Sequence, residues 1–330
     1  KSEAEVYFTE ISLLVHELNL HISRLGSWAK RVRVQTPLHF WPSKSYIQPE
    51  PLGISLIIAP WNYPFQLTIN PLIGAISAGC CALVKPSPFS VHTSQVIDEL
   101  LSEIYPPEYI KVVHGSKEEN EFILKEKFDV IFFTGSPTVG KVVMKAASEH
   151  LTPVILELGG KSPCIVDSSA SIPLSAKRIA WSKAINAGQT CIAPDFLIVH
   201  SSVKDQLISE IIKNWKEMLG DDMQKSPYYN RIIHKEAYER LSGYLRNKEV
   251  CFGGTCDPED LFISPTLIDN ISFSDDIMQQ EIFGPILPII TFDTMDEVVT
   301  QLTSKEKPLA MYYYGVEKTG LSLFEKLSFG

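Results

Sequence analysis

Cys191 ends the stretch NAGQTC, in which Gly, Gln and Thr are too frequent for a strand of the core. A cysteine can pack as a small apolar group, bind a metal or act as a nucleophile. The chain has no Cys-x-x-Cys pair, and its eight His are scattered without ligand spacing, so neither a disulfide framework nor a metal site is expected. Packing and nucleophilic catalysis remain as the two interpretations of Cys191.

Two further side chains could complete acyl chemistry at a cysteine. Glu157 follows an apolar run and precedes two glycines, which is a position suited to a general base. Asn62 lies in WNYPF, where two prolines stiffen the chain, so its amide could donate to a developing oxyanion. The alternatives are a solvent-facing glutamate beside a tight turn and an asparagine that only forms a turn.

The stretch FFTGSPTVGKVVMK, residues 132–145, reads as a strand, a glycine-rich turn and a helix, which together can bind an anion. The spacing of Gly135, Gly140 and Lys141 nearly matches a nucleotide-triphosphatase P-loop. Val142 occupies the place of the Ser or Thr that would bind Mg²⁺, so that class is disfavoured. The G-x-G-x-x-G dinucleotide fingerprint is also missing, and a purely structural turn stays open.

The stretch QQEIFGP, residues 279–285, offers a carboxylate and an aromatic ring side by side. Glu281 is a candidate to bind a sugar diol, and Phe283 is a candidate to cover an aromatic ring. The alternative is a strand entry that contains a Gly-Pro turn.

These candidates are carried by alternating strand and helix patterns. Apolar runs typical of buried strands alternate with segments of helical spacing at 67–79, 91–104, 119–125 and 139–150. The alternation predicts βαβ units and a parallel sheet, and a second α/β block begins near residue 152. The predicted fold class is therefore α/β with two domains, 1–157 and 158–330, and a connector over 29–50.

Composition excludes several partners. The net charge is −9 and no basic stripe is present, so a nucleic-acid partner is not expected. No apolar run reaches the roughly 20 residues that cross a bilayer, and the charged first segment does not resemble a secretory leader. Sparse cysteines favour a reducing compartment, and we predict a cytoplasmic protein. The chain starts and stops in helical patterns, so both ends look truncated.

Taken together, six motifs resemble those of the aldehyde dehydrogenase superfamily and occur in the order and at the spacing of that family. They are WNYPF, LVKPS, FTGS, ELGGKSP, GQTC and EIFGP. EPLG, GQTCIAPD and EKPLA are most similar to the class 3 branch, which includes fatty aldehyde dehydrogenases. The resemblance implies a Rossmann-like NAD(P)-binding domain over 1–157, a catalytic domain over 158–330, and a bridging or oligomerisation role for 29–50. It implies oxidation of medium- or long-chain aliphatic or aromatic aldehydes to acids, with NAD or alternatively NADP.

The resemblance also assigns roles to individual residues. It makes Cys191 the nucleophile, Asn62 the oxyanion donor and Glu157 the base that activates water. The residues that it places at the cofactor are Lys85 at the adenosine ribose, Gly135 and Ser136 at the pyrophosphate, Val139 near the adenine, Glu281 at the nicotinamide ribose and Phe283 at the ring.

One residue departs from the family pattern. After Lys85-Pro86-Ser87 the family usually has a Glu that repels a 2′-phosphate, and this chain has Pro88, which leaves the choice between NAD and NADP open. The family also implies a homodimer, and a membrane anchor beyond residue 330 stays open. The rival interpretations are a cysteine hydrolase that uses no nucleotide, a non-catalytic or damaged relative, and a CoA-acylating relative, which Glu157 disfavours.

Overall fold

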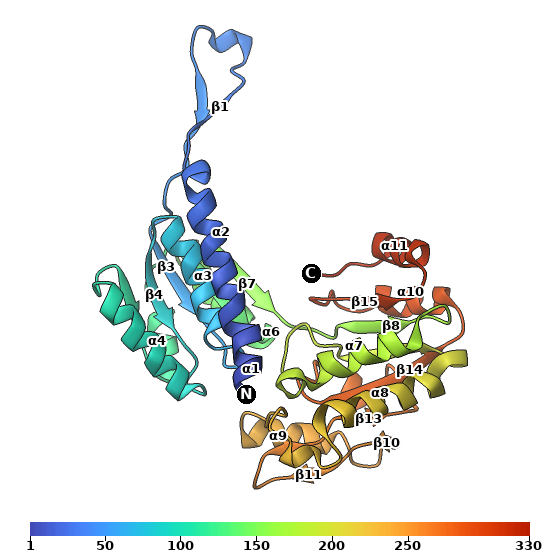
Figure 1. Ribbon diagram of the computed structural model, residues 1–330. Coiled ribbons are helices and arrows are strands. Elements are labelled where there is room, and N and C mark those ends of the chain that lie inside the picture. Colours follow the sequence, from blue (N-terminus) through green and yellow to red (C-terminus); the bar gives the residue numbers. More distant parts are fainter. The chain divides into compact units, whose positions relative to one another are not determined.

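The computed structural model describes the backbone of residues 1–330 and every side chain except that of Lys117. The chain divides into two compact units, shown with their elements in Figure 1. We call Val6–Glu157 the N-terminal unit, and Leu158–Gly330 together with Lys1–Glu5 the C-terminal unit. Each contains a largely parallel sheet with helices, so the predicted α/β fold class is confirmed.

The N-terminal unit is built on a five-stranded sheet in the order β5-β4-β3-β6-β7. In its central strand three consecutive residues, Ser55, Leu56 and Ile57, are buried, as expected for a parallel sheet covered on both faces. The strands are β3 (Ile54–Ile58), β4 (Cys81–Lys85), β5 (Ile110–Val112), β6 (Val130–Gly135) and β7 (Val154–Leu158).

The strand pattern grouped the run at 154–158 with the second block, in disagreement with the domain boundary predicted at 157–158, and this grouping was wrong. The run forms β7, which lies beside β6 at the edge of the N-terminal sheet. Only alternate residues of β7 are partly buried, which is the pattern of an edge strand with one covered face.

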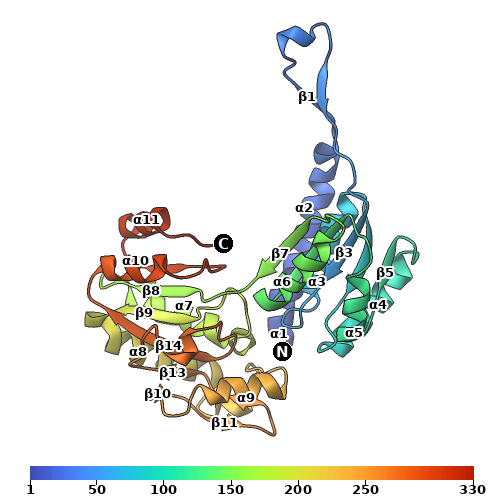
Figure 2. The same cartoon turned by 180° about the vertical axis from the view of Figure 1, so that it is seen from behind.

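Helices cover both faces of this sheet. Along the chain α3 connects β3 to β4, α4 connects β4 to β5, and α6 connects β6 to β7. In Figure 1 α3 lies in front of the sheet, and in Figure 2 α6 lies in front of it. The helices of this unit are α2 (Ser12–Trp28), α3 (Gln66–Ser77), α4 (Val91–Ile104), α5 (Lys117–Ile123) and α6 (Pro137–Ser148), with a π-helical turn at Tyr7–Ile11. The short helix α1 (Glu3–Val6) precedes them and belongs mostly to the C-terminal unit.

The connector over 29–50 forms a hairpin that extends from the end of α2 (Figure 1). Its strands, β1 (Val32–Val34) and β2 (Ser45–Ile47), pair antiparallel, and a short 3₁₀ turn at Leu38–Phe40 lies between them. Several of its large apolar side chains are exposed, including Leu38, Phe40 and Trp41.

The C-terminal unit has a six-stranded sheet in the order β10-β13-β14-β9-β8-β15, in which only the β10 pairing is antiparallel. Its helices α7 and α8 pack against each other, and the buried Trp215 of α8 donates its indole N–H to the carbonyl of Ala180 on α7.

The remaining bounds of this unit are as follows. The strands are β8 (Pro163–Val166), β9 (Phe196–His200), β10 (Val250–Phe252), β13 (Thr266–Ile268), β14 (Ile286–Phe292) and β15 (Tyr312–Tyr314), with a small hairpin of β11 (Cys256–Asp257) and β12 (Phe262–Ile263). The helices are α7 (Ile172–Ala184), α8 (Lys204–Leu219), α9 (Lys235–Gly243), α10 (Met295–Thr303) and α11 (Glu317–Lys326), with 3₁₀ turns at Ile185–Gly188, Ser201–Val203, Met223–Lys225 and Asp276–Met278. Among the described residues, no helix combines the length and apolar character needed to cross a bilayer.

Candidate active site

Cys191 lies on a loop that begins with an unusual backbone turn at the end of α7. Three consecutive residues, Asn186, Ala187 and Gly188, have positive φ values of 50°, 50° and 69°. Such left-handed residues are strained when they are not glycine, and they concentrate at functional sites. At Gly188 a side chain would also collide with the chain, because a Cβ there would lie 2.3 Å from the carbonyl oxygen of Gly284.

Buried amides lock this turn in place. The Gln189 side chain is 2% exposed and donates to the carbonyls of Asn186 and Arg231, each at 3.0 Å. Its oxygen accepts from the backbone N–H of Ile233, also at 3.0 Å. The Glu5 carboxylate accepts from the backbone N–H of Asn186 at 3.1 Å, so a residue far away in sequence holds the same turn.

The loop beyond Cys191 is fixed through its carbonyl groups. The Tyr312 hydroxyl of β15 donates to the carbonyl of Ile192, and the buried Lys183 ammonium donates to the carbonyl of Pro194 at 2.9 Å. Burial lowers the pKa of Lys183 to about 8. Cys191 is half-buried and takes part in no disulfide. By contrast Cys164 lies fully buried in β8, and its desolvation raises the pKa of that thiol strongly, as expected for a packing cysteine.

Glu281 and Phe283 lie in the same unit as Cys191, on the loop that leads into β14. The Glu281 carboxylate accepts the backbone N–H of Gly160, and a Cβ on Gly159 would lie 2.3 Å from its oxygens. Burial, with a smaller contribution from the Asp195 carboxylate, raises the pKa of Glu281 to about 7. Phe283 has a φ of 49°, so this loop too contains a left-handed residue.

In the N-terminal unit, Asn62 is 4% exposed and follows β3. The turn around it is held by a hydrogen bond from the Leu67 N–H to the Tyr63 carbonyl at 2.9 Å, and by the Thr68 hydroxyl, which donates to the Pro64 carbonyl at 2.6 Å. These bonds fix the short segment that connects Asn62 to α3.

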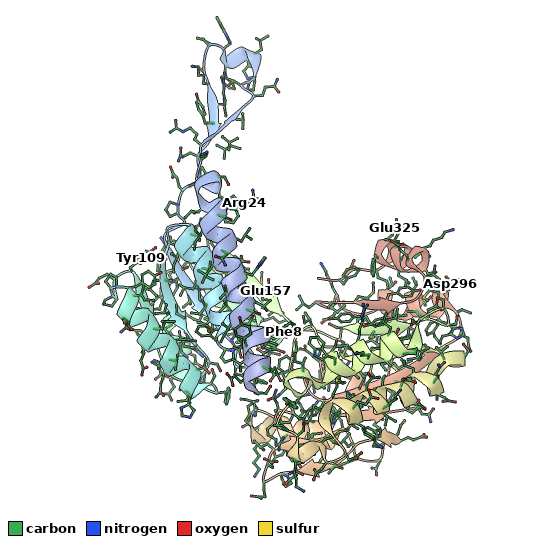
Figure 3. The ribbon with its side chains drawn as sticks, in the orientation of Figure 1. Phe8, Arg24, Tyr109, Glu157, Asp296 and Glu325 are labelled. Atoms are coloured by element: carbon green, nitrogen blue, oxygen red, sulfur yellow. The ribbon has the colours of Figure 1, made fainter. Side chains whose placement is uncertain are left out.

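Glu157 lies near the end of β7, where Figure 3 labels it. Its side chain is exposed, whereas the sequence pattern suggested a position beside a buried strand end. The physical reason is that β7 is an edge strand in which successive side chains alternate between the two faces.

The other predicted cofactor residues lie at the carboxyl ends of β4 and β6. Lys85 is 1% exposed, and its ammonium donates to the carbonyls of Gly115 at 2.8 Å and Pro86 at 3.1 Å. Burial lowers the pKa of Lys85. Ser136 caps α6, since its hydroxyl accepts from the backbone N–H of Val139, whose side chain is exposed.

The sheet therefore brings the strand ends that carry Lys85, Gly135 and Ser136 to one edge, together with the end of β3 that precedes Asn62. Ligands of open α/β sheets bind at this edge. Thr134, between these elements, has a buried hydroxyl for which the described part of the chain supplies no hydrogen-bond partner. The turn from β6 into α6, with this hydroxyl beside it, is therefore suited to binding a polar ligand.

Sequence reasoning missed the groups that hold the candidate side chains. These are Glu5, Lys161, Lys183, Gln189, Asp195 and Tyr312. The available signal was the presence of Lys161 and Asp195 inside the motifs ELGGKSP and GQTCIAPD, because charges in otherwise small or apolar loops need partners.

Comparisons with known proteins agree with this architecture. The chain is similar to the 4,4′-diaponeurosporen-aldehyde dehydrogenase of Staphylococcus aureus, with 45% identity over all of this chain and 72% of that protein. It is 41% identical to aldehyde dehydrogenase family 3 member A2 of Pongo abelii and 40% identical to the dimeric NADP-preferring aldehyde dehydrogenase of Rattus norvegicus. Each match covers 95% of this chain, and the chain spans 65% and 69% of the two mammalian proteins.

Solved structures give the same result. The substrate-bound state of Staphylococcus aureus AldH matches with a TM-score of 0.97 and 44% identity, over 99% of this chain and 72% of that one. A Mycobacterium tuberculosis aldehyde dehydrogenase complexed with NAD⁺ matches with a TM-score of 0.88 and 25% identity, over 100% of this chain and 70% of that one. The model of the aldehyde dehydrogenase family matches residues 4–330, and the chain belongs to that family of NAD(P)-dependent aldehyde-oxidising enzymes.

Proposed function

We propose that the whole protein oxidises apolar aldehydes to carboxylic acids with NAD⁺ or NADP⁺, through a covalent intermediate on Cys191. Family membership supports the reaction class. The observation that carries the assignment of the nucleophile is the loop around Cys191, because strained left-handed residues and buried amides fix it while the thiol stays half-buried. A cysteine that only filled space would not need such a backbone.

The N-terminal unit fits a dinucleotide. Lys85, Gly135 and Ser136 lie at one sheet edge, where backbone N–H groups at the start of α6 suit a pyrophosphate. The unpartnered Thr134 hydroxyl adds a polar group there. Two matched proteins are described as NAD⁺-bound and NADP-preferring. The bound cofactor would accept a hydride from the substrate carbon.

The residues of the chain itself supply the remaining chemistry. The Cys191 thiolate attacks the aldehyde carbon and forms a thiohemiacetal, whose oxyanion the Asn62 amide stabilises by donating a hydrogen bond. Loss of hydride leaves a thioester on Cys191. Glu157 then takes a proton from water, the hydroxide attacks the thioester carbonyl, and the carboxylic acid leaves as the thiolate re-forms. The exposure of Glu157 is compatible with its access to water.

The proposed substrate is a medium- or long-chain aliphatic aldehyde or an aromatic aldehyde. Support comes from the 40–45% identity to members of family 3 and to the diaponeurosporen-aldehyde enzyme. A substrate profile that peaks at a charged semialdehyde and ignores hexanal would contradict this proposal.

We also propose a cytoplasmic homodimer. None of the six cysteines forms a disulfide, as is usual in a reducing compartment. The exposed apolar side chains of the 29–50 hairpin, Leu38, Phe40 and Trp41 among them, are suited to burial against a second copy. Sedimentation of the wild type beside a variant with polar residues at these three positions tests the dimer.

The deciding experiment is absorbance at the NADH band when the purified protein meets hexanal or benzaldehyde with NAD⁺ or NADP⁺. The wild type should produce the band and Cys191→Ala should not, while Cys164→Ala should keep most of the activity. If no aldehyde gives signal with either cofactor, a non-catalytic relative is the better interpretation. Ester hydrolysis without any nucleotide-dependent oxidation would favour the cysteine hydrolase instead.

A further inference from the structure

An ion pair joins two loops of the C-terminal unit, one before β8 and one after Cys191. The Lys161 ammonium pairs with the Asp195 carboxylate, and it donates to the carbonyls of Ile277 and Gln280, each at 3.0 Å. All three of its N–H groups therefore have acceptors. Asp195 is 3% exposed, and its second oxygen accepts from the backbone N–H of Ile282 at 2.8 Å.

This pair binds the backbone immediately before and immediately after Glu281. The carbonyl of Gln280 and the N–H of Ile282, the two neighbours of Glu281, are bound by Lys161 and Asp195 respectively. The backbone N–H of Asp195 also donates to the carbonyl of Ser162 at 2.9 Å. The pair thus ties together the ELGGKSP loop, the chain that follows Cys191 and the EIFGP loop.

We infer that Lys161 and Asp195 are positioning residues that hold the Glu281 carboxylate against Gly159–Gly160 and, by their opposite charges, set its ionisation and with it the affinity for the cofactor. This inference rests on the proposed function, in which Glu281 holds the nicotinamide ribose. Linking the loops alone would not require charged residues, because a neutral hydrogen-bonding pair could do the same. The two charges are needed for their effect on the Glu281 carboxylate.

The charges that act on Glu281 have opposite signs. Burial and the Asp195 carboxylate disfavour the charged form of Glu281, whereas the Gly160 N–H, Lys161 and Lys183 favour it. The first two outweigh the others, and the pKa of Glu281 is raised to about 7. Arg240 donates to the carbonyls of Glu281 and Ile282 from α9, and the Tyr244 hydroxyl accepts from Gln280. A ribose hydroxyl donates better to a carboxylate than to a neutral acid. Cofactor affinity should therefore fall as the pH falls through the pKa of Glu281.

Removing either charge should move this pKa in a direction that a structural role does not explain. Asp195→Asn removes a negative charge and keeps an oxygen for the Ile282 N–H, so the pKa should fall. Lys161→Gln removes a positive charge, so the pKa should rise. Shifts of about one pH unit are expected when a neighbouring charge of a buried carboxylate is removed.

The experiment measures the Kd for NAD⁺ by titration from about pH 5.5 to about pH 9 with the full chain. In the wild type, affinity should weaken below the midpoint, and Glu281→Gln should abolish this titration. The midpoint should move down in Asp195→Asn and up in Lys161→Gln, while Lys161→Arg should restore the wild-type midpoint. As matched controls, Lys204→Gln and Asp269→Asn break another partly buried pair of the same unit, with 2.7 Å between its atoms, and should not shift it.

Midpoints that move in the same direction, or not at all, in folded variants would overturn the inference and leave the pair a purely structural link. If Asp195→Asn fails to fold, the inference is tested by comparing the wild type with Glu281→Gln. A Kd of the wild type that does not depend on pH would also overturn the inference. Absence of NAD⁺ binding by the wild type at every pH would instead count against the proposed function.

Discussion

The Glu10 carboxylate accepts a hydrogen bond from the backbone N–H of Phe65 at 2.8 Å, and so caps the start of α3 three residues after Asn62. Glu10 is 4% exposed although it lies in the first helical segment of the chain. The π-helical turn at Tyr7–Ile11 contains it, and such turns are frequent at functional sites. A negative charge at a helix N-terminus is favourable, since it faces the positive end of the helix dipole.

The first prediction concerns this cap. Glu10→Ala should lower the free energy of unfolding by about 2 kcal/mol, the usual loss for a hydrogen bond to a charged group, and Glu10→Gln by less because an amide oxygen still accepts. Urea denaturation measures both. Glu17→Ala, which breaks a partly buried pair with His21 on α2, is the control and should cost no more than about 1 kcal/mol. If all three variants lower the free energy of unfolding equally, the hydrogen bond to Phe65 does not contribute more to stability than a surface contact.

The second prediction separates the two halves of the reaction. Glu157→Gln should leave attack by Cys191 largely intact and slow hydrolysis of the thioester, because the lost carboxylate acts on water. Stopped-flow absorbance should show a burst of NADH followed by a slow steady state. Loss of the burst together with the steady rate would mean that Glu157 acts before hydride transfer.

The third prediction concerns the choice of cofactor. Pro88 has no charge to repel a 2′-phosphate, and Lys85 can pair with one, so NADP⁺ should be at most about tenfold worse than NAD⁺ in kcat/KM, or about 1.4 kcal/mol. Pro88→Glu should lower activity with NADP⁺ and spare NAD⁺. Paired kcat/KM measurements on both proteins test this. A wild type that already prefers NAD⁺ by a hundredfold would mean that another group excludes the phosphate.

The fourth prediction uses the contact between Gly159 and Glu281. A methyl group in Gly159→Ala would occupy the place of the Glu281 carboxylate, which can swing away because it ends a flexible side chain. Stability should therefore change little, while the KM for NAD⁺ should rise about tenfold, or about 1.4 kcal/mol. Gly243→Ala, where a Cβ would meet no atom within 4 Å, is the matched control. An unchanged KM in Gly159→Ala would show that Glu281 does not need this position.

Much of the fold could be predicted from the sequence because hydrophobic periodicity reports directly on strands and helices. The helices at Gln66–Ser77 and Val91–Ile104 are of this kind, since the pattern predicts them at 67–79 and 91–104. The assignment of β7 failed because an apolar run does not reveal which sheet it joins. Edge pairing depends on contacts with β6, which precedes it in the chain and is linked to it by α6.

The candidate side chains could be named from their motifs, but their supports could not. Ala187 gives no sign in the sequence that it adopts a positive φ, which costs energy for any residue with a Cβ. The partner of Lys161 lies 34 residues away, and no pattern of spacing specifies it. Glu10 looks like one more charge on an amphipathic helix until the π-helical turn directs it inward.

The hydrogen bonds of Glu5 have a consequence for the construction of chimeric enzymes. Its carboxylate binds the N–H of Asn186 and the side-chain amide of Asn230 at 2.9 and 3.0 Å, so Lys1–Glu5 belongs with Leu158–Gly330 although the whole N-terminal unit intervenes in sequence. A single crossover at residue 157 would therefore separate parental partners that evolved together. Recombinants between relatives should exchange the first five residues along with 158–330, so that the turn before Cys191 keeps its own anchor.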